Sequence, residues 1–169
     1  MTDDSTYEFS TDPDRIDAAR VHELIVDTYW GPGRSREMMD AATAGSRPYG
    51  VYRRDTGAQV AFARVVTDGV TFAWLSDVVV DPSLRGQGIG KLLIGGVIAD
   101  LEPLGLRRTL LATADAQSLY EQFGWVRVDP QYTWMELPGT GAGPRFGVSA
   151  GTPTSTTPGP QAGPLGAPA

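Results

Sequence analysis

A glycine-rich stretch that follows an apolar run is the part of this sequence best suited to chemistry. Residues 78–80 (VVV) are β-branched and typical of a strand, and residues 85–90 (RGQGIG) lead from there into a run of helical period. The first turn of a helix presents unpaired N–H groups and the positive end of the helix dipole, and glycines let a phosphate approach the main chain closely. The stretch therefore predicts a site for a phosphate-bearing ligand.

Two common phosphate-binding motifs disagree with this stretch at named positions. A P-loop needs glycine where Arg85 stands, and Ser or Thr after Lys91, where the sequence has Leu92. A dinucleotide fingerprint needs its third glycine at position 91, and it should follow the first strand of a repeated βαβ pattern. Here the stretch follows what reads as an antiparallel meander, so both motifs are excluded.

Three segments of the chain resemble the GNAT superfamily of N-acyltransferases. Arg85, Gly88 and Gly90 match its acyl-CoA-binding pattern (Gln/Arg)-x-x-Gly-x-(Gly/Ala). Residues 119–125 (LYEQFGW) resemble the later Leu-Tyr-x-x-Phe-Gly-Phe element of that family, and residues 29–35 (YWGPGRS) are similar to the Tyr-Trp-x-x-Gly-Arg-Ser segment of certain bacterial members. The resemblance covers about residues 5–137.

The resemblance implies a fold and a reaction. The fold is a mixed α/β (α+β) domain, with a mostly antiparallel sheet of about seven strands and about four flanking helices. The reaction is direct transfer of an acetyl group from acetyl-CoA to a primary amine, with Tyr120 protonating the leaving thiolate. Tyr120 as a packing aromatic is the alternative. The implied cofactor-binding residues are Val78, Val79, Val80, Arg85, Gly86, Gln87, Gly88, Ile89, Gly90, Lys91 and Asp115.

The general base is not fixed by the resemblance. Many relatives carry a Glu-Asp pair on the strand before the glycine loop, whereas this chain has Ser76-Asp77. Asp77 is the nearest carboxylate and is our second catalytic candidate, although strand alternation can turn it to the other face. A water held by Asp77, or a base from residues 29–35, is an open alternative. Because Ser76 stands where relatives carry the glutamate, a non-catalytic acyl-CoA-binding or regulatory module that has lost the base is the alternative function.

The acceptor region is also placed by the resemblance. Relatives use the early helix-loop-helix to bind the acceptor, which implies substrate-binding roles for Tyr29, Trp30 and Arg34. Core and cap roles for these three residues are the alternative. Asp115 stands where many relatives carry an Asn that touches the cofactor, so its own role is left open.

The chemistry of amide formation agrees with direct transfer. An alkyl amine has a pKa of about 10.4, so its deprotonation near pH 7 costs roughly 4 kcal/mol that a base or a desolvated water path must supply. The chain has no cysteine, which excludes an acyl-cysteine intermediate. Attack of the amine on the thioester, with proton removal and donation by positioned groups, is what remains.

Composition limits the other classes of partner. The 169 residues carry a net charge of −6, which argues against nucleic acid and weakly favours a cationic acceptor. With no cysteine and one histidine, we expect no metal site. The sequence shows no N-terminal apolar segment and no run of 18 apolar residues, so we expect a cytoplasmic protein that does not bind membranes. The expected acceptor is a small-molecule or peptide amine, with a protein lysine also open, and the expected assembly is a monomer or homodimer.

Hydrophobic period and turn signals give the expected elements. Strands are expected at residues 6–10, 49–53, 59–66, 70–80, 108–112, 126–128 and 132–137, and helices at residues 13–29, 34–44, 88–102 and 115–123. Asp68-Gly69 predicts a two-residue hairpin. One domain should span residues 1–137. The last 32 residues hold 7 of the 13 prolines, 8 of the 21 glycines and one charge, which predicts a disordered Pro/Gly/Thr-rich tail at 138–169.

Overall fold

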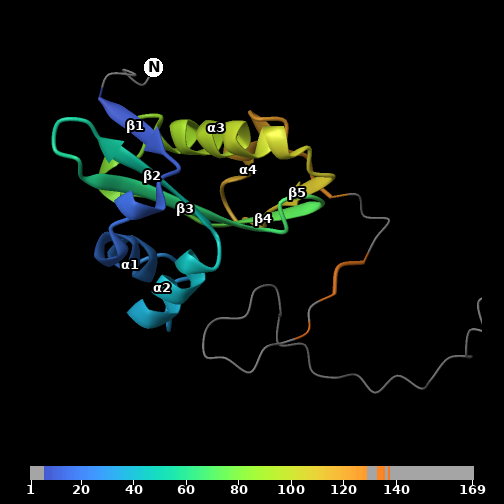
Figure 1. The fold of residues 1–169 in the computed structure, drawn as a ribbon, viewed down its shortest axis with the longest axis horizontal. Helices are drawn as coiled ribbons and strands as arrows, with labels where there is room; N and C mark the ends of the chain where they lie inside the picture. Colours follow the sequence, from blue (N-terminus) through green and yellow to red (C-terminus); the bar gives the residue numbers. More distant parts are fainter. Residues whose placement is uncertain (1–5, 129–132, 136, 138–169) are drawn as a thin grey trace, which may run out of the picture.

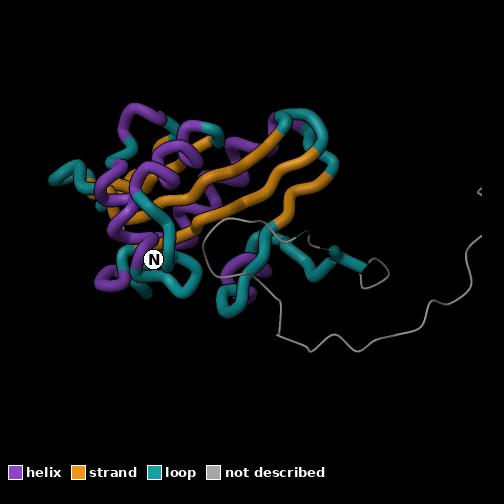
Figure 2. Tube along the Cα trace, turned by 90° about the horizontal axis from the view of Figure 1, so that it is seen from below, coloured by secondary structure: helices purple, strands orange, loops and turns teal. Residues whose placement is uncertain are grey.

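A single mixed sheet forms the centre of the computed structural model, which describes residues 6–128, 133–135 and 137. Within these residues the sheet has five strands in the order β1-β2-β3-β4-β5, and only β4 and β5 are parallel (Figures 1 and 2). The strands are β1 (Tyr7–Ser10), β2 (Arg47–Arg53), β3 (Gln59–Thr67), β4 (Phe72–Val80) and β5 (Arg108–Leu110). The mixed, mostly antiparallel α/β class expected from the sequence is confirmed.

Helices cover both faces of the sheet (Figure 1). One face carries α1 (Ala18–Val26) and α2 (Arg36–Ala44), and the other carries α3 (Ile89–Leu101) and α4 (Gln117–Glu121). The core is accordingly divided into two clusters. The larger one packs α3 against the sheet, and the smaller one packs α1 and α2 against Phe62 and Val79.

The sequence pattern of residues 89–101 explains why α3 is a helix and which of its faces is buried. Its buried residues recur at helical spacing and form the stripe that faces the sheet: Ile89, Leu93, Ile94, Val97 and Leu101. The helix is the right-handed crossover that parallel β4 and β5 require. The glycine-rich stretch lies at its N-terminus, so the crossover fixes that stretch at the end of β4.

A β-bulge interrupts β4 next to the glycine-rich stretch. Phe62 of β3 pairs with Val79 while Arg64 pairs with Ser76, so two steps on β3 span three on β4. The extra residue reverses the alternation of side chains. Leu75, before the bulge, packs in the α3 cluster, whereas Val79, after it, packs in the α1/α2 cluster.

Several expected boundaries are wrong, the first helix among them. Asp12 caps a short 3-10 turn at Pro13–Arg15 instead of a long helix, and the chain becomes extended at Ile16. Asp17 then caps α1 by accepting a hydrogen bond from the Arg20 amide at 3.0 Å, and the helix ends at Val26. Asp12 was expected to cap the helix, and the structure gives that role to Asp17, five residues later.

The hairpin between β3 and β4 is longer than two residues. Pairing ends at Thr67 and Ala73, and the Asp68 carboxylate accepts hydrogen bonds from the amides of Val70, Thr71 and Phe72. Asp68 therefore has the turn role suggested by its sequence context. One side chain satisfies three amides that a tight two-residue turn would not expose.

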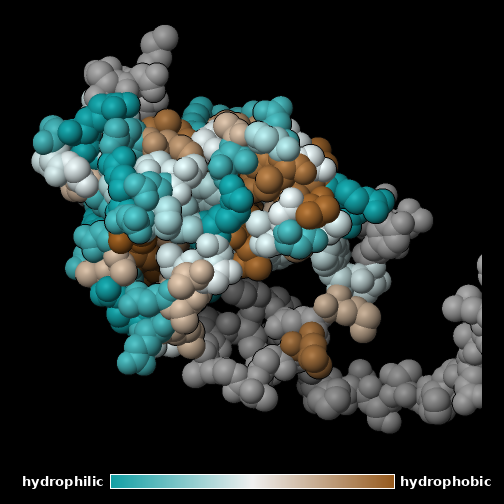
Figure 3. Space-filling view, viewed as in Figure 1, coloured by the Kyte–Doolittle hydropathy of each residue, from teal (hydrophilic) through white to brown (hydrophobic). Residues whose placement is uncertain are grey.

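The expected strand at residues 126–128 does not form. Val126 is 86% exposed, and an apolar groove lies between this segment, the end of α3 and β5. Apolar side chains gather over this end of the molecule (Figure 3). The expected strand at 132–137 is also not seen, because residues 133–135 and 137 have no strand structure and residues 132 and 136 lie outside the described residues. Residues 1–5 and the expected tail at 138–169 lie outside them as well. In the part of the chain that is described, no helix is long and apolar enough to cross a membrane.

Candidate active site

The glycine-rich stretch forms an open turn at the N-terminus of α3. Gly86 and Gly88 have φ values of 80° and 81°, a left-handed conformation that L side chains rarely adopt. The first intrahelical bond runs from the Leu92 amide to the Gly88 carbonyl at 3.0 Å, so the amides before Leu92 in the turn have no acceptor within the helix. A Cβ atom on Gly86 would meet nothing within 4 Å, so its side of the turn is open. This geometry fits an anionic phosphate group.

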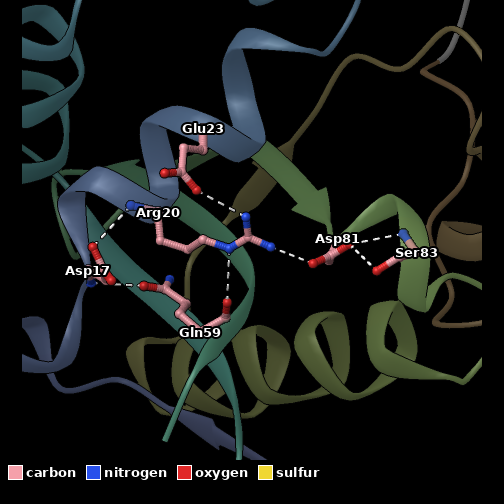
Figure 4. A network of polar contacts seen from close by, with 6 residues as sticks. All are labelled: Asp17, Arg20, Glu23, Gln59, Asp81 and Ser83. Atoms are coloured by element: carbon pink, nitrogen blue, oxygen red, sulfur yellow. Dashed lines mark hydrogen bonds and ion pairs between the residues drawn. The ribbon is translucent and has the colours of Figure 1, made fainter.

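Contacts on both sides of the turn hold it against the domain. The Tyr7 hydroxyl of β1 donates to Gln87 Oε1 at 3.0 Å. Before the turn, Asp81 accepts from the Ser83 amide at 2.9 Å and forms an ion pair with Arg20 of α1, which also bonds to the Gln59 carbonyl (Figure 4). The Oε1 atom of Gln87 is therefore bonded to β1, which anchors the turn to the edge of the sheet.

A cleft of about 550 Å³ lies between this turn, the last three residues of β4, the segment after α1 and α4. It brings together most of the residues named from the sequence: Tyr29, Trp30, Val78, Val79, Val80, Arg85, Gly86, Gly88, Ile89, Gly90, Lys91, Asp115 and Tyr120. Asp77, Gln87 and Arg34 are not among the residues that line it. The cleft thus joins the two motifs that the sequence separates by thirty residues.

The strand that borders the cleft has unpaired main chain. The parallel pairing of β4 with β5 ends at Trp74 and Leu110 in the described residues, while Val79 and Val80 pair only with β3. On the β5 side, the N–H and C=O groups of residues 78–80 therefore face the cleft without a strand partner. An extended ligand can use such an edge as a neighbouring strand would.

Tyr120 lies on the wall of this cleft, on α4. The residue is 7% exposed, and its ring makes an edge contact with Trp125 at a centroid distance of 5.9 Å. Burial, reinforced by the charge of Asp115, raises the pKa of Tyr120 to about 12. The hydroxyl is therefore fully protonated at neutral pH, as a proton donor must be.

A second wall of the cleft comes from the segment after α1. The Ala114 amide donates to the Tyr29 hydroxyl at 3.4 Å, which connects this segment to the loop after β5. The rings of Tyr29 and Trp30 meet edge to face at 4.6 Å. The Trp30 Nε1 atom is buried without a hydrogen-bond partner among the described residues, so this wall retains a free donor.

The two ends of the cleft differ in charge. Arg85 and Lys91 are its basic residues and belong to the glycine-rich turn, whereas Asp27 and Asp115 are its acidic ones. Asp27 follows α1 and was missed at the sequence level, because nothing in its local pattern separates it from a helix cap. In the described residues, no group of three or more His, Cys, Asp or Glu side chains could hold a metal ion.

Asp77 lies on the opposite face of β4 from the cleft. Its side chain is 1% exposed, and its carboxylate is paired with Arg34 Nη1 at 2.5 Å and with Arg64 Nε at 2.6 Å. Arg34 comes from the segment between α1 and α2, and Arg64 comes from β3. Arg64 was also missed, because only the pairing of β3 with β4 places it beside Asp77.

Sequence comparison gives the chain its family. Residues 16–125 match the acetyltransferase (GNAT) family. A protein of Gibberella zeae that carries an acetyltransferase name is 30% identical over 133 residues, which cover 68% of this chain and 75% of that protein. A rice protein named serotonin N-acetyltransferase 2, chloroplastic, is 39% identical over 75 residues, or 44% of this chain and 37% of that protein.

Solved structures agree with this assignment. A GNAT-family structure from Xanthomonas campestris pv. campestris superimposes with a TM-score of 0.70 at 37% identity, over 79% of this chain and 95% of the other. A Mycobacterium tuberculosis protein in complex with CoA shares the fold alone, with a TM-score of 0.60 at 18% identity over 72% and 73% of the two chains. The fold and cleft are those of an acyl-CoA-dependent transferase. This chain belongs to the GNAT family of acetyltransferases.

Proposed function

We propose that this protein transfers the acetyl group of acetyl-CoA to a primary amine by direct attack. The observation that carries the proposal is the single cleft that joins the open glycine turn, the unpaired edge of β4 and Tyr120. A phosphate site, an extended main-chain edge and a proton donor are the three features that such a transfer needs, and they follow one another along this cleft.

The donor would be held mainly by the main chain. The amides of residues 86–91 and the charges of Arg85 and Lys91 suit the pyrophosphate of CoA. The free main-chain groups of residues 78–80 suit the amide-containing pantetheine arm. The thioester would then lie between β4 and Tyr120, at the far end from the turn.

The reaction then needs a base that takes a proton from the amine and an acid that gives a proton to the departing thiolate. The amine nitrogen attacks the thioester carbon, the C–N bond forms and the C–S bond breaks. Of the carboxylates that line the cleft, Asp115 lies close enough to Tyr120 for its charge to raise the pKa of the phenol, so Asp115, acting directly or through water, is our choice of base. Tyr120 gives its proton to the departing thiolate and regains one from solvent. Asp77 is paired with two arginines, so its role would be to position neighbouring parts of the site and not to take up a proton.

The acceptor end of the cleft suits a cationic amine as the acceptor. Such an amine would carry no phosphate or carboxylate group of its own. Its charged residues are Asp27 and Asp115, and its aromatic residues are Tyr29 and Trp30. Such a wall attracts an ammonium group and stacks against an apolar body. The rice relative is named for serotonin, an amine of that kind.

The test of this proposal is a thiol-release assay with acetyl-CoA and a panel of primary amines. We expect turnover with cationic arylalkylamines, and we expect Tyr120→Phe to lower kcat by roughly a hundredfold while the Kd for CoA changes little. Tyr49→Phe is the matched control, because Tyr49 is also a buried tyrosine but bonds to Asp100 away from the cleft. Equal losses in the two variants would contradict the role of Tyr120.

A non-catalytic acyl-CoA-binding module is the second candidate. It is favoured by the pairing of Asp77, since the strand before the turn then offers no free carboxylate to the cleft. A rise in melting temperature with CoA, together with no thiol release across a broad panel of amines and acyl donors, would support this module. The absence of any CoA-induced shift would contradict both functions.

A further inference from the structure

A buried cluster of three charged residues connects the two sides of the acceptor cleft from behind. Arg34, Asp77 and Arg64, which we call the Arg–Asp–Arg cluster, come from the α1–α2 segment, β4 and β3. The Asp77 side chain is 1% exposed, and those of Arg34 and Arg64 are 22% and 15% exposed. Each carboxylate oxygen is paired with a different arginine, at 2.5 Å and 2.6 Å. Buried charges persist where they are paired in this way.

The cluster is located where the backbone of β4 departs from a regular strand. Asp77 has a φ of 54°, and among the described residues it is the one non-glycine residue with a positive φ. It lies inside the bulge between the Arg64–Ser76 and Phe62–Val79 pairs. A left-handed backbone costs free energy even for an aspartate, and contacts of the side chain can offset that cost. The two arginines are the groups that hold it.

The bulge decides which way the next three residues face. Because it inserts one residue, Val78 and Val80 contact the α3 cluster and line the cleft, while Val79 packs toward α1 and α2. In a strand without the bulge, residues 78 and 80 would face α1 and α2, and residue 79 would face α3. The conformation of Asp77 therefore determines how the main chain of residues 78–80 meets the donor.

The same cluster fixes the acceptor side of the cleft. Arg34 ends the segment that carries Asp27, Tyr29 and Trp30, and its carbonyl lies 3.1 Å from His22 Nε2. Its amide bonds to the Gly31 carbonyl at 3.1 Å. Its guanidinium reaches Asp77, so the ion pair joins this segment to the bulge.

We propose that the Arg–Asp–Arg cluster is a positioning device that sets the acceptor wall and the thioester-binding strand at a fixed distance from each other. Its members touch neither substrate nor cofactor. The proposal rests on the acetyl transfer argued above and deepens it. The glycine turn has separate anchors, Tyr7–Gln87 and Arg20–Asp81, so the cluster should govern the acceptor and the reaction rate more than CoA binding.

The test compares Arg34→Gln, Arg34→Lys and Asp77→Asn with a matched control, Arg36→Gln. Asn keeps the size of Asp77 and tolerates a left-handed backbone, so the variant removes the charge and one of the two acceptor oxygens. Arg36 lies two residues from Arg34 and pairs with Asp40 in an exposed i,i+4 contact, which makes it the surface equivalent. Measurements are kcat, the KM for the amine, the Kd for CoA, melting temperature and amide hydrogen exchange.

We expect Arg34→Gln to raise the KM of the amine about tenfold, and Asp77→Asn to lower kcat by about ten- to a hundredfold, with the Kd for CoA within about twofold. Arg34→Lys should recover part of the loss. The double variant Arg34→Gln/Asp77→Asn should be less impaired than the product of the single effects, because the two residues share one contact. Arg36→Gln should behave like the unmodified protein.

Hydrogen exchange keeps the proposal testable even if no acceptor is found. Arg34→Gln and Arg34→Lys should speed exchange in residues 29–35 and in residues 76–80 together, and leave the turn at 85–90 unchanged. Faster exchange in only one of these segments, or a lower melting temperature with unchanged kcat and KM, would overturn the positioning role. Failure of thiol release in the unmodified protein would contradict the proposed function and leave the exchange result to decide the cluster.

Discussion

Tyr120 has the environment of a proton donor at the residue scale. Its hydroxyl is buried beside the charge of Asp115, and both effects disfavour the phenolate, so the pKa rises to about 12. A donor with a high pKa holds its proton throughout the physiological range. It also transfers that proton less readily, so the transfer must be coupled to breakage of the C–S bond.

This gives a pH prediction. The capacity of Tyr120 to donate is present below its pKa and is lost only as the pH rises through about 12. The kcat for acetyl transfer should therefore show no decrease due to Tyr120 between pH 8 and 10.5, measured by thiol release at saturating substrates. A descending limb with a midpoint near pH 10 that is absent in Tyr120→Phe would contradict this environment.

At the scale of elements, the glycine turn and α3 act as one unit. The turn needs left-handed residues so that the chain can leave β4 and enter the helix with its amides outward, and α3 needs small residues where it crosses β1 and α4. Conformation accounts for Gly86 and Gly88 of the turn, and close packing against Phe9 accounts for Gly96 inside the helix.

A matched pair of glycines tests the turn. Gly86 and Gly105 have φ values of 80° and 60°, and a Cβ on either would meet no atom within 4 Å. Each change to Ala should lower the free energy of unfolding by about 1 kcal/mol, because the backbone strain is alike. Only Gly86→Ala should also weaken CoA binding, by about tenfold or more in titration calorimetry. Equal CoA affinity in the two variants would place the phosphate elsewhere.

A second pair of glycines tests the packing of α3. A Cβ on Gly96 would lie 2.5 Å from the ring of Phe9 in β1, whereas a Cβ on Gly95 would lie 3.5 Å from Phe123. Gly96→Ala should therefore lower the free energy of unfolding by about 1–3 kcal/mol through overpacking. Gly95→Ala should raise it by up to about 1 kcal/mol through lower chain entropy. Urea denaturation measures both, and a stabilising Gly96→Ala would show that β1 and α3 can separate freely.

At the scale of the whole molecule, buried tyrosines connect stability to alkaline pH. Burial raises the pKa of Tyr49, and it raises that of Tyr52 and of Tyr120 to about 12. Below pH 10 the hydroxyls of these tyrosines stay protonated in both the folded and the unfolded protein. Above it the unfolded chain releases them while the folded chain retains them, so the folded state loses relative stability.

We therefore expect the free energy of unfolding to fall by roughly 1 kcal/mol or more between pH 9 and pH 11, before native ionisation begins. Urea denaturation at several pH values measures the slope. Tyr52→Phe should make the slope shallower, because one of the shifted groups is then missing. A flat profile up to pH 11 would mean that these hydroxyls ionise equally easily in both states.

The sequence by itself determined much of this molecule. The apolar run 78–80, the glycines after it and the apolar stripe of α3 are local patterns, so strand, turn and helix could be predicted in this order. Tyr120 was named from a second local motif. Local patterns also misled: the helix expected from residue 13 begins at Ala18, and the strand expected at residues 126–128 does not form.

Only the tertiary structure decided how the candidate site is arranged. Asp77 read as the nearest carboxylate to the glycine turn, but one inserted residue in β4 turns it to the opposite face, where two arginines from distant segments pair with it. Arg34 was expected at the acceptor and lies behind it. A bulge follows from how two strands align and an ion pair from which segments meet, and neither is a property of a local run of residues. For that reason the glycine turn could be predicted from its own residues, and the positions of the Asp77 and Arg34 side chains could not.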